Sequence, residues 1–204
     1  MDPFQHWLES GLDQRDPERE FEGEQLIEFF TRFNRDIGTI RNAWSDAQLA
    51  EGIWYLYGCG SCYLGELSKL EPNIKTAQFF DSVIVLYKDL FEARCTTFFS
   101  HLDRGPEPPN PLNGACYMLW DMDCGLDSFS YSGRPEYIQL SIDLLGRLSA
   151  STHPAVIESV IHGLGHMMLD HRKQCQPILE CIAAANLPPE LKEYADNALN
   201  SCIQ

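Results

Sequence analysis

The chain has 204 residues, of which 44% are hydrophobic and 22% are charged, and this length allows one sizeable buried core. Its 15 basic and 30 acidic residues give a net charge of −15. That balance argues against nucleic-acid binding and against a broad basic face that would hold an anionic membrane. It permits a cationic partner, and solubility alone accounts for it equally well.

The first 28 residues contain nine acidic side chains and two arginines, with no apolar run of the kind found in signal peptides. No stretch has the apolar length that a membrane-spanning helix needs. We therefore expect a cytoplasmic protein with no membrane association, whose eight cysteines are reduced thiols. The sequence contains no Gly-rich phosphate loop, nucleophile elbow or dinucleotide fingerprint. This predicts no cofactor and favours a non-enzymatic role over catalysis.

Residues 1–20 contain two prolines and a glycine among acids, which predicts a loosely ordered acidic arm before a single helical domain over residues 21–204. An acidic run over residues 16–24 leads into a first helix at about 21–36, where negative charge suits the positive end of the helix dipole. A docking surface for a basic partner is the alternative interpretation of this run.

The Ser45-Asp46 pair can cap a second helix that runs to about Leu67. This helix contains the segment 58–62, whose two glycines weaken a helix by about 1 kcal/mol each. We interpret the segment as a place where another helix packs closely. Cys59 and Cys62 have the C-x-x-C spacing of metal and redox sites, but no second such pair, nearby histidine or βαβ pattern supports that chemistry.

A third helix is expected from about Ile74 to Phe99, and its almost entirely apolar middle predicts a central, buried position. Four prolines within residues 103–113 predict a connection there, and it is the best candidate for an internal domain boundary. A short helix over residues 115–121 follows. Three of its side chains are expected in the core, namely Tyr117, Leu119 and Trp120.

Asp121, Asp123 and Asp127 then lie in a glycine-containing loop. A calcium loop of the EF-hand type needs glycine at its sixth position and glutamate at its twelfth. Counted from Asp121, those positions hold Leu126 and Ser132, which excludes an EF-hand. A looser cation site in this loop remains an alternative.

From residue 135 the pattern becomes regular, because prolines fall in the first turns of successive predicted helices. The helices are expected from Pro135 to Leu148, from Pro154, from near Pro177, and from Pro188-Pro189 to about Cys202. Their short connections favour antiparallel neighbours. Gly146 and Gly165 occupy the same phase of an echoed pattern, which predicts close helix packing at both.

The clearest amphipathic helix runs from Pro154 to Asp170. One of its faces is apolar and is expected to pack on the core, with Val156, Ile157, Val160, Ile161, Leu164, Met167 and Met168. On the opposite side a polar series follows at i+4 spacing, formed by Glu158, His162, His166 and Asp170. The helix wheel therefore predicts an exposed polar ridge.

The segment 153–165 (HPAVIESVIHGLG) resembles the helix of HEAT-like, armadillo-type repeats, which often reads Pro, Val, a small-apolar spacing and then Leu-Gly. The resemblance covers about residues 135–202. Ile157 takes the place of the usual arginine after the valine, and no recurrence of about 40 residues is visible before residue 135. The resemblance implies an all-α fold, with antiparallel helices in an αα-superhelix and one face available to a protein partner. It brings no catalytic residue.

Three functional hypotheses follow, and the first is a protein-interaction module whose partner-binding surface is the ridge of Glu158, His162, His166 and Asp170. The second is a metal-binding protein or metal-dependent hydrolase, since His162 and His166 at i and i+4 can hold one ion with Asp170 or Glu158 as an oxygen ligand. Gly163 replaces the glutamate of the zinc-protease pattern, which weakens the hydrolase alternative.

The third hypothesis is an acidic inhibitor or immunity-type protein that binds a cationic target through the acidic run near the N-terminus. Beside all three stands the simpler interpretation that the two histidines only bridge neighbouring helices. The sequence leaves the partner, the pathway and the oligomeric state open.

Overall fold

The computed structural model describes residues 23–58, 60–102, 110–122 and 124–203, and these residues form helices and no strand. The all-α prediction is therefore confirmed. The acidic arm predicted for residues 1–20 lies outside the described residues.

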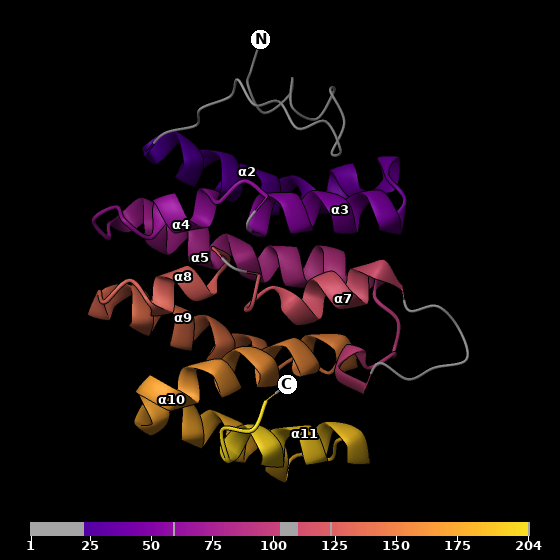
Figure 1. The fold of residues 1–204 in the computed structure, drawn as a ribbon. Coiled ribbons are helices and arrows are strands. Elements are labelled where there is room, and N and C mark those ends of the chain that lie inside the picture. The colour runs from indigo at the N-terminus through magenta and orange to yellow at the C-terminus, as the bar shows by residue number, and fades with distance from the viewer. Residues whose placement is uncertain (1–22, 59, 103–109, 123, 204) are drawn as a thin grey trace.

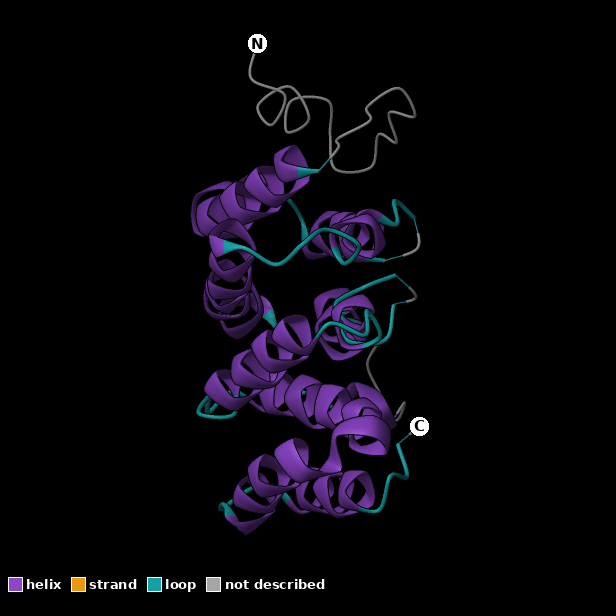
Figure 2. Ribbon diagram, turned by 90° about the vertical axis from the view of Figure 1, so that its left-hand side faces the viewer, coloured by secondary structure: helices purple, strands orange, loops and turns teal. Residues whose placement is uncertain are grey.

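The helices lie in successive layers from one end of the chain to the other (Figure 1), and from the side they fall into two columns (Figure 2). The longer helices are α2 (Glu24–Ile40), α3 (Asp46–Tyr57), α5 (Ile74–Leu86), α7 (Pro111–Met118), α9 (Pro135–Leu148), α10 (Pro154–Ala184) and α11 (Pro189–Leu199). The shorter ones are η1 (Arg41–Ala43), α4 (Tyr63–Leu67), η2 (Tyr87–Phe91), α6 (Glu92–Arg94), η3 (Ser100–Leu102) and α8 (Asp127–Ser130). Helix α2 packs on α5 and α5 on α9, while α3 packs on α7 and α7 on α10. Helix α10 also packs on α9 and α11, so it has neighbours on several sides.

The predicted start of the second helix is confirmed. The Ser45 hydroxyl accepts a hydrogen bond from the backbone N–H of Gln48, and the Gln48 side chain accepts one from the backbone N–H of Ser45. This reciprocal capping box satisfies two backbone donors at the beginning of α3. The first helix, predicted for residues 21–36, begins at Glu24 and continues to Ile40.

The prediction that the second helix runs to Leu67 is wrong. Helix α3 ends at Tyr57 and α4 begins at Tyr63, because Gly58 takes an extended backbone with φ −118° and ψ −168°. A Cβ atom on Gly58 would lie 2.6 Å from the backbone oxygen of Trp54 in α3 and 3.3 Å from that of Met122. The glycine therefore relieves a clash with its own helix and also permits a close approach, but the approaching neighbour is the loop after α7 and not another helix.

The third helix packs on α2 and α9, but only one of its faces is buried, because Ile74 and Asp81 are exposed. The predicted buried position is therefore confirmed for that face alone. Elements α5, η2 and α6 follow one another without a gap from Ile74 to Arg94, with a π-helical stretch in η2. They end before the predicted Phe99, because Cys95 takes an extended backbone with ψ 149°.

Helix α7 begins inside the segment that was predicted to be a connection. The Asn110 side chain accepts a hydrogen bond from the backbone N–H of Leu112 (2.9 Å), and Pro111 occupies the first turn. Residues 103–109 lie outside the described residues, so the domain boundary stays a prediction. The expected core residues of the short helix are buried, namely Tyr117, Leu119 and Trp120.

Helix α10 has a break at His171, whose φ of −125° and ψ of 33° are not helical. The break follows directly after the predicted helix end at Asp170. Pro177 lies inside the second half of α10 and not at its start. Helix α11 begins at Pro189 as predicted and ends at Leu199, before the expected Cys202.

Helix α10 approaches its neighbours most closely at two glycines. A Cβ atom on Gly163 would lie 2.7 Å from the indole ring of Trp120, and one on Gly165 would lie 2.5 Å from the side chain of Ile203. Close packing at Gly165 is thus confirmed. A Cβ atom on Gly146, in α9, would lie an ordinary 3.5 Å from its nearest neighbour, the side chain of Ile178. The prediction of close packing at Gly146 is therefore wrong.

We expect Gly163→Ala to lower the free energy of unfolding by about 1–3 kcal/mol, because the added methyl group must displace a close-packed ring. That ring belongs to Trp120, which is buried and whose indole N–H donates to the Tyr87 hydroxyl (3.0 Å). Gly146→Ala is the matched control, since it has room for the methyl group and should raise the stability by up to about 1 kcal/mol. Urea unfolding followed by circular dichroism measures both changes, and equal losses would contradict the packing argument.

Candidate metal centre

Two helices bring three potential metal ligands together. His162 and His166 are one turn apart on α10, and their Nε2 atoms lie 3.2 Å from each other. Asp121 follows the end of α7, where its backbone N–H donates to the carbonyl oxygen of Met118 (2.7 Å). Its Oδ2 atom lies 3.4 Å from Nε2 of His166 and 3.8 Å from Nε2 of His162. In the described part of the chain this is the one group of three such ligands.

The size of this triangle suits a small divalent ion. A tetrahedral site with bonds of about 2.0–2.1 Å has ligand-to-ligand edges of about 3.3 Å. Two of the observed edges, 3.2 and 3.4 Å, lie near that length, and the third is longer at 3.8 Å. The side chain of His162 is only 3% exposed, whereas His166 is 28% and Asp121 is 44% exposed, so solvent reaches the cluster from the side of the last two.

The remaining ring nitrogen of His162 has a partner of its own. Its Nδ1 atom lies 2.7 Å from the hydroxyl of Tyr194, which in turn lies 3.1 Å from the hydroxyl of Tyr117. Metal-binding histidines commonly donate the hydrogen of the other nitrogen to such a partner, which fixes the tautomer. With the proton on Nδ1, the lone pair of Nε2 is directed into the cluster. Burial raises the pKa of Tyr194, so its hydroxyl stays protonated.

Burial also keeps His162 neutral. It lowers the pKa of this side chain to about 3, and the neighbouring charges of His166 and His101 act in the same direction. A neutral imidazole is the form that binds a metal ion.

This shift predicts the pH dependence of the metal-free protein. An ordinary histidine has a pKa of 6.5, so the unfolded chain binds one proton more than the folded chain between about pH 3 and pH 6.5. Stability should therefore be complete above pH 6.5 and fall as the pH falls, with a loss of about 3 kcal/mol by pH 4. We expect His162→Gln to remove this part of the slope, and unfolding free energies of both proteins across the range measure it. Parallel profiles would contradict it.

A second polar pair lies behind these ligands. Glu158 is completely buried, and its Oε1 atom accepts a hydrogen bond from the backbone N–H of His101 (2.8 Å) and lies 2.6 Å from Nδ1 of the same residue. The ring of His101 stacks on Tyr194, with centroids 4.2 Å apart and planes at 8°. A chain of side-chain contacts thus runs from Glu158 through His101 and Tyr194 to His162. The other oxygen of Glu158 has no hydrogen-bond partner in the described protein.

The prediction of an exposed polar ridge on α10 is wrong. Glu158 and His162 are buried, so neither can contact a partner directly. The cause is the packing of α10 against α7, α9 and α11, which covers its polar side as well as its apolar side. His166 is partly exposed and Asp170 is exposed. The predicted apolar face is confirmed, and its seven side chains are buried, namely Val156, Ile157, Val160, Ile161, Leu164, Met167 and Met168.

The predicted metal set is corrected at one position. The structure brings His162 and His166 together, but the third member of the cluster is Asp121 and not Asp170. Asp121 lies in the acidic loop for which the sequence left a looser cation site as an alternative. Asp127 of that loop has its pKa raised by burial and by the charge of Asp121, so both carboxylates lie in one region. Asp123 lies outside the described residues, as does Cys59 of the C-x-x-C pair, whose role stays untested.

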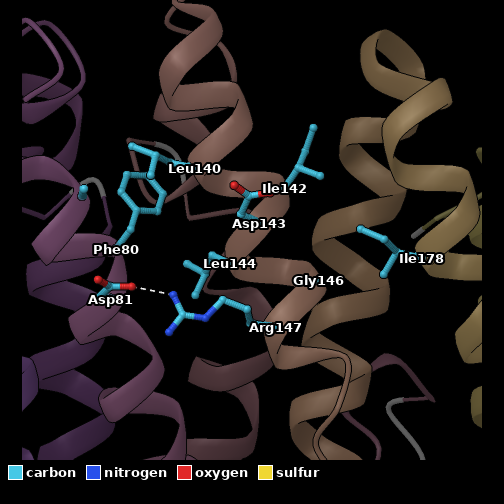
Figure 3. A pocket seen from close by; sticks show the side chains of 10 residues that line it. Phe80, Asp81, Leu140, Ile142, Asp143, Leu144, Gly146, Arg147 and Ile178 are labelled. Atoms are coloured by element: carbon cyan, nitrogen blue, oxygen red, sulfur yellow. Dashed lines mark hydrogen bonds and ion pairs between the residues drawn. The ribbon is translucent and has the colours of Figure 1, made fainter.

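A groove of about 470 Å³ lies on another part of the molecule (Figure 3). It is lined by α5, α9 and the side chain of Ile178 from α10, and an ion pair between Asp81 and Arg147 bridges α5 and α9. A smaller cavity of about 260 Å³ touches His101 and Tyr194, with Glu190 and Glu193 of α11 beside it.

Searches of protein-family models, curated proteins and solved structures found no match to this chain. None of the described helices has the length and apolar character required to cross a membrane.

Proposed function

We propose that the protein binds one zinc ion through Asp121, His162 and His166. The observation that carries the proposal is the triangle of ligand atoms, with edges of 3.2, 3.4 and 3.8 Å. The hydrogen bond from His162 to Tyr194 supplies the outer support that zinc-binding histidines usually have. Three protein ligands leave the fourth position for water or for an anionic group of a ligand.

The ligand types favour zinc over calcium and magnesium. Imidazole nitrogens together with one carboxylate are ordinary zinc ligands, whereas calcium and magnesium prefer oxygen alone. Metal binding thus becomes the leading functional proposal for this chain.

The test is a zinc titration of the metal-free protein in competition with a chelator of known affinity. We expect one ion per chain, and Asp121→Asn should weaken the binding by at least about tenfold because a neutral amide is a poor zinc ligand. Asp170→Asn is the matched control and should bind as the wild type does. Binding well below one ion per chain, or equal losses in the two variants, would overturn the proposal.

The support of His162 gives a further prediction. Tyr194→Phe should weaken zinc binding by about 10–100-fold, because it removes the hydroxyl that holds the ring in place. Tyr137→Phe is the control, since that buried hydroxyl donates to backbone oxygens of Leu67 and Leu70 and lies outside the cluster. The same chelator competition measures both variants. An unchanged affinity in Tyr194→Phe would refute the supporting role.

We also propose that the stack is a HEAT-like αα-superhelix that serves as a protein-interaction module. The two columns of helices support the arrangement, and the groove across α5, α9 and α10 offers a concave surface with Leu140 and Ile178 in its lining.

A photo-crosslinking amino acid at position 140 should form an adduct with a cellular protein, and one at the exposed position 74 should not. Equal labelling, or none, would contradict the role. Dissociation by salt would identify a basic partner.

A further inference from the structure

The turn that follows α6 is hydrogen-bonded to the beginning of α7. The buried side-chain amide of Asn113 accepts a hydrogen bond from the backbone N–H of Thr96 (2.9 Å) and donates one to its carbonyl oxygen (2.9 Å). Asn110 donates to the carbonyl oxygen of Arg94 (3.1 Å). Both chain neighbours of Cys95 are therefore held against α7.

A second cysteine lies at the same place on α7. Cys116 comes one helical turn after Asn113, so its side chain leaves the same face of the helix. Its thiol is completely buried, donates to the carbonyl oxygen of Ala155 (3.5 Å), and interacts with the thiol of Cys95. Cys95 itself is only partly buried. The hydrogen bonds of Asn110 and Asn113 thus hold Cys95 beside the face of α7 that bears Cys116, and solvent reaches only Cys95.

We propose that Cys95 and Cys116 form a disulfide when the protein meets a hydroperoxide. The Cys95 thiol, as its thiolate, attacks the terminal oxygen of the hydroperoxide, the O–O bond breaks, and a sulfenic acid and an alcohol form; hydrogen peroxide gives water in place of the alcohol. The Cys116 thiol then attacks the Cys95 sulfur. The S–S bond forms, the S–O bond breaks, and water leaves with the thiol proton. The two sulfurs together lose two electrons, which the peroxide takes up.

The order of the two steps follows from accessibility. Cys116 is completely buried and Cys95 is partly exposed, so the hydroperoxide reaches the Cys95 thiol first. The partly exposed Cys95 is the first, and Cys116 resolves the sulfenic acid. The new bond would tie α7 to the segment that presents His101 to Glu158. Because a disulfide restrains the unfolded chain, the oxidised protein should unfold at a higher temperature than the reduced protein.

The test uses the full chain with Cys181 and Cys202 replaced by serine, since both are exposed and would compete for the oxidant. After treatment with an equivalent of hydrogen peroxide, intact mass should show the loss of two hydrogens. Peptide mapping should find a single cross-link between Cys95 and Cys116. Thermal unfolding should shift upward, and a reductant should reverse the shift.

Two further variants in the same background make the result decisive. Cys95→Ser should abolish the cross-link, and Cys175→Ser, which removes another buried thiol, should leave it intact. The proposal is overturned if other cysteines pair while Cys95 stays reduced. It is also overturned if Cys95 is recovered as an unchanged thiol, or as a sulfinic acid without a bond to Cys116.

Discussion

His166→Ala is expected to weaken zinc binding on the order of 100-fold or more while the fold is retained. The substitution leaves only two protein ligands, and two ligands hold zinc poorly in competition with water. The side chain of His166 is 28% exposed, so its truncation creates no closed cavity in the core. Chelator competition measures the affinity, and urea unfolding of the metal-free variant measures the fold.

The matched control for this prediction is His171→Ala. It removes the same type of side chain from the same helix, at the break in α10 and outside the ligand cluster. Its zinc affinity should equal that of the wild type. If His171→Ala loses as much affinity as His166→Ala, or if neither loses any, the ligand assignment is wrong.

Glu158→Ala is expected to cost about 3–5 kcal/mol of unfolding free energy, because one partner of a buried polar pair is removed. The side chain is completely buried, accepts a hydrogen bond from the backbone N–H of His101, and lies 2.6 Å from Nδ1 of its ring. Without it the backbone N–H of His101 loses its acceptor, the ring loses its partner, and a cavity remains. Glu158→Gln keeps an acceptor oxygen of the same size and should cost less. Urea unfolding at a fixed pH compares the two.

An exposed ion pair provides the control for this second prediction. Arg134 pairs with Glu71 (2.7 Å), whose side chain is 85% exposed. Glu71→Ala should change the stability by less than about 1 kcal/mol, because exposed pairs are screened by water. A loss in Glu158→Ala no larger than that in Glu71→Ala would show that the buried pair does not support the fold.

The features of the fold that depend on residues close together in the sequence were predicted correctly. The Ser45 cap, the prolines that begin α9, α10 and α11, and the apolar face of α10 depend on neighbouring residues and on helical periodicity. The break between α3 and α4 was missed, because two glycines weaken a helix without requiring its end. A side chain at Gly58 would meet the backbone oxygens of Trp54 and Met122, and the second of these is far away in the sequence.

The burial of the polar side of α10 could not be predicted from the sequence. A helix wheel separates polar from apolar positions, but it does not say what covers the polar side. Glu158 finds its partner His101 at a separation of 57 residues, and His162 finds Tyr194 at a separation of 32. These pairs satisfy polar groups that would otherwise need water. No local pattern in the sequence signals them.

The metal ligands were partly visible in the sequence. The spacing of His162 and His166 predicted that both could hold one ion, and the structure brings them together. The third ligand was sought on the same helix at Asp170, although Asp121 lay in a loop already recognised as acidic. Only the packing of α7 on α10 joins that loop to the histidines.

The central claim is that a zinc ion is held by two imidazoles and a carboxylate, and X-ray absorption at the zinc edge tests it most directly. The protein loaded with one equivalent of zinc should show only nitrogen and oxygen neighbours at about 2.0–2.1 Å, with the outer-shell scattering of two imidazole rings. The chain also contains eight cysteines, which are the natural rival ligands. A sulfur shell at about 2.3 Å would contradict the assignment to Asp121, His162 and His166.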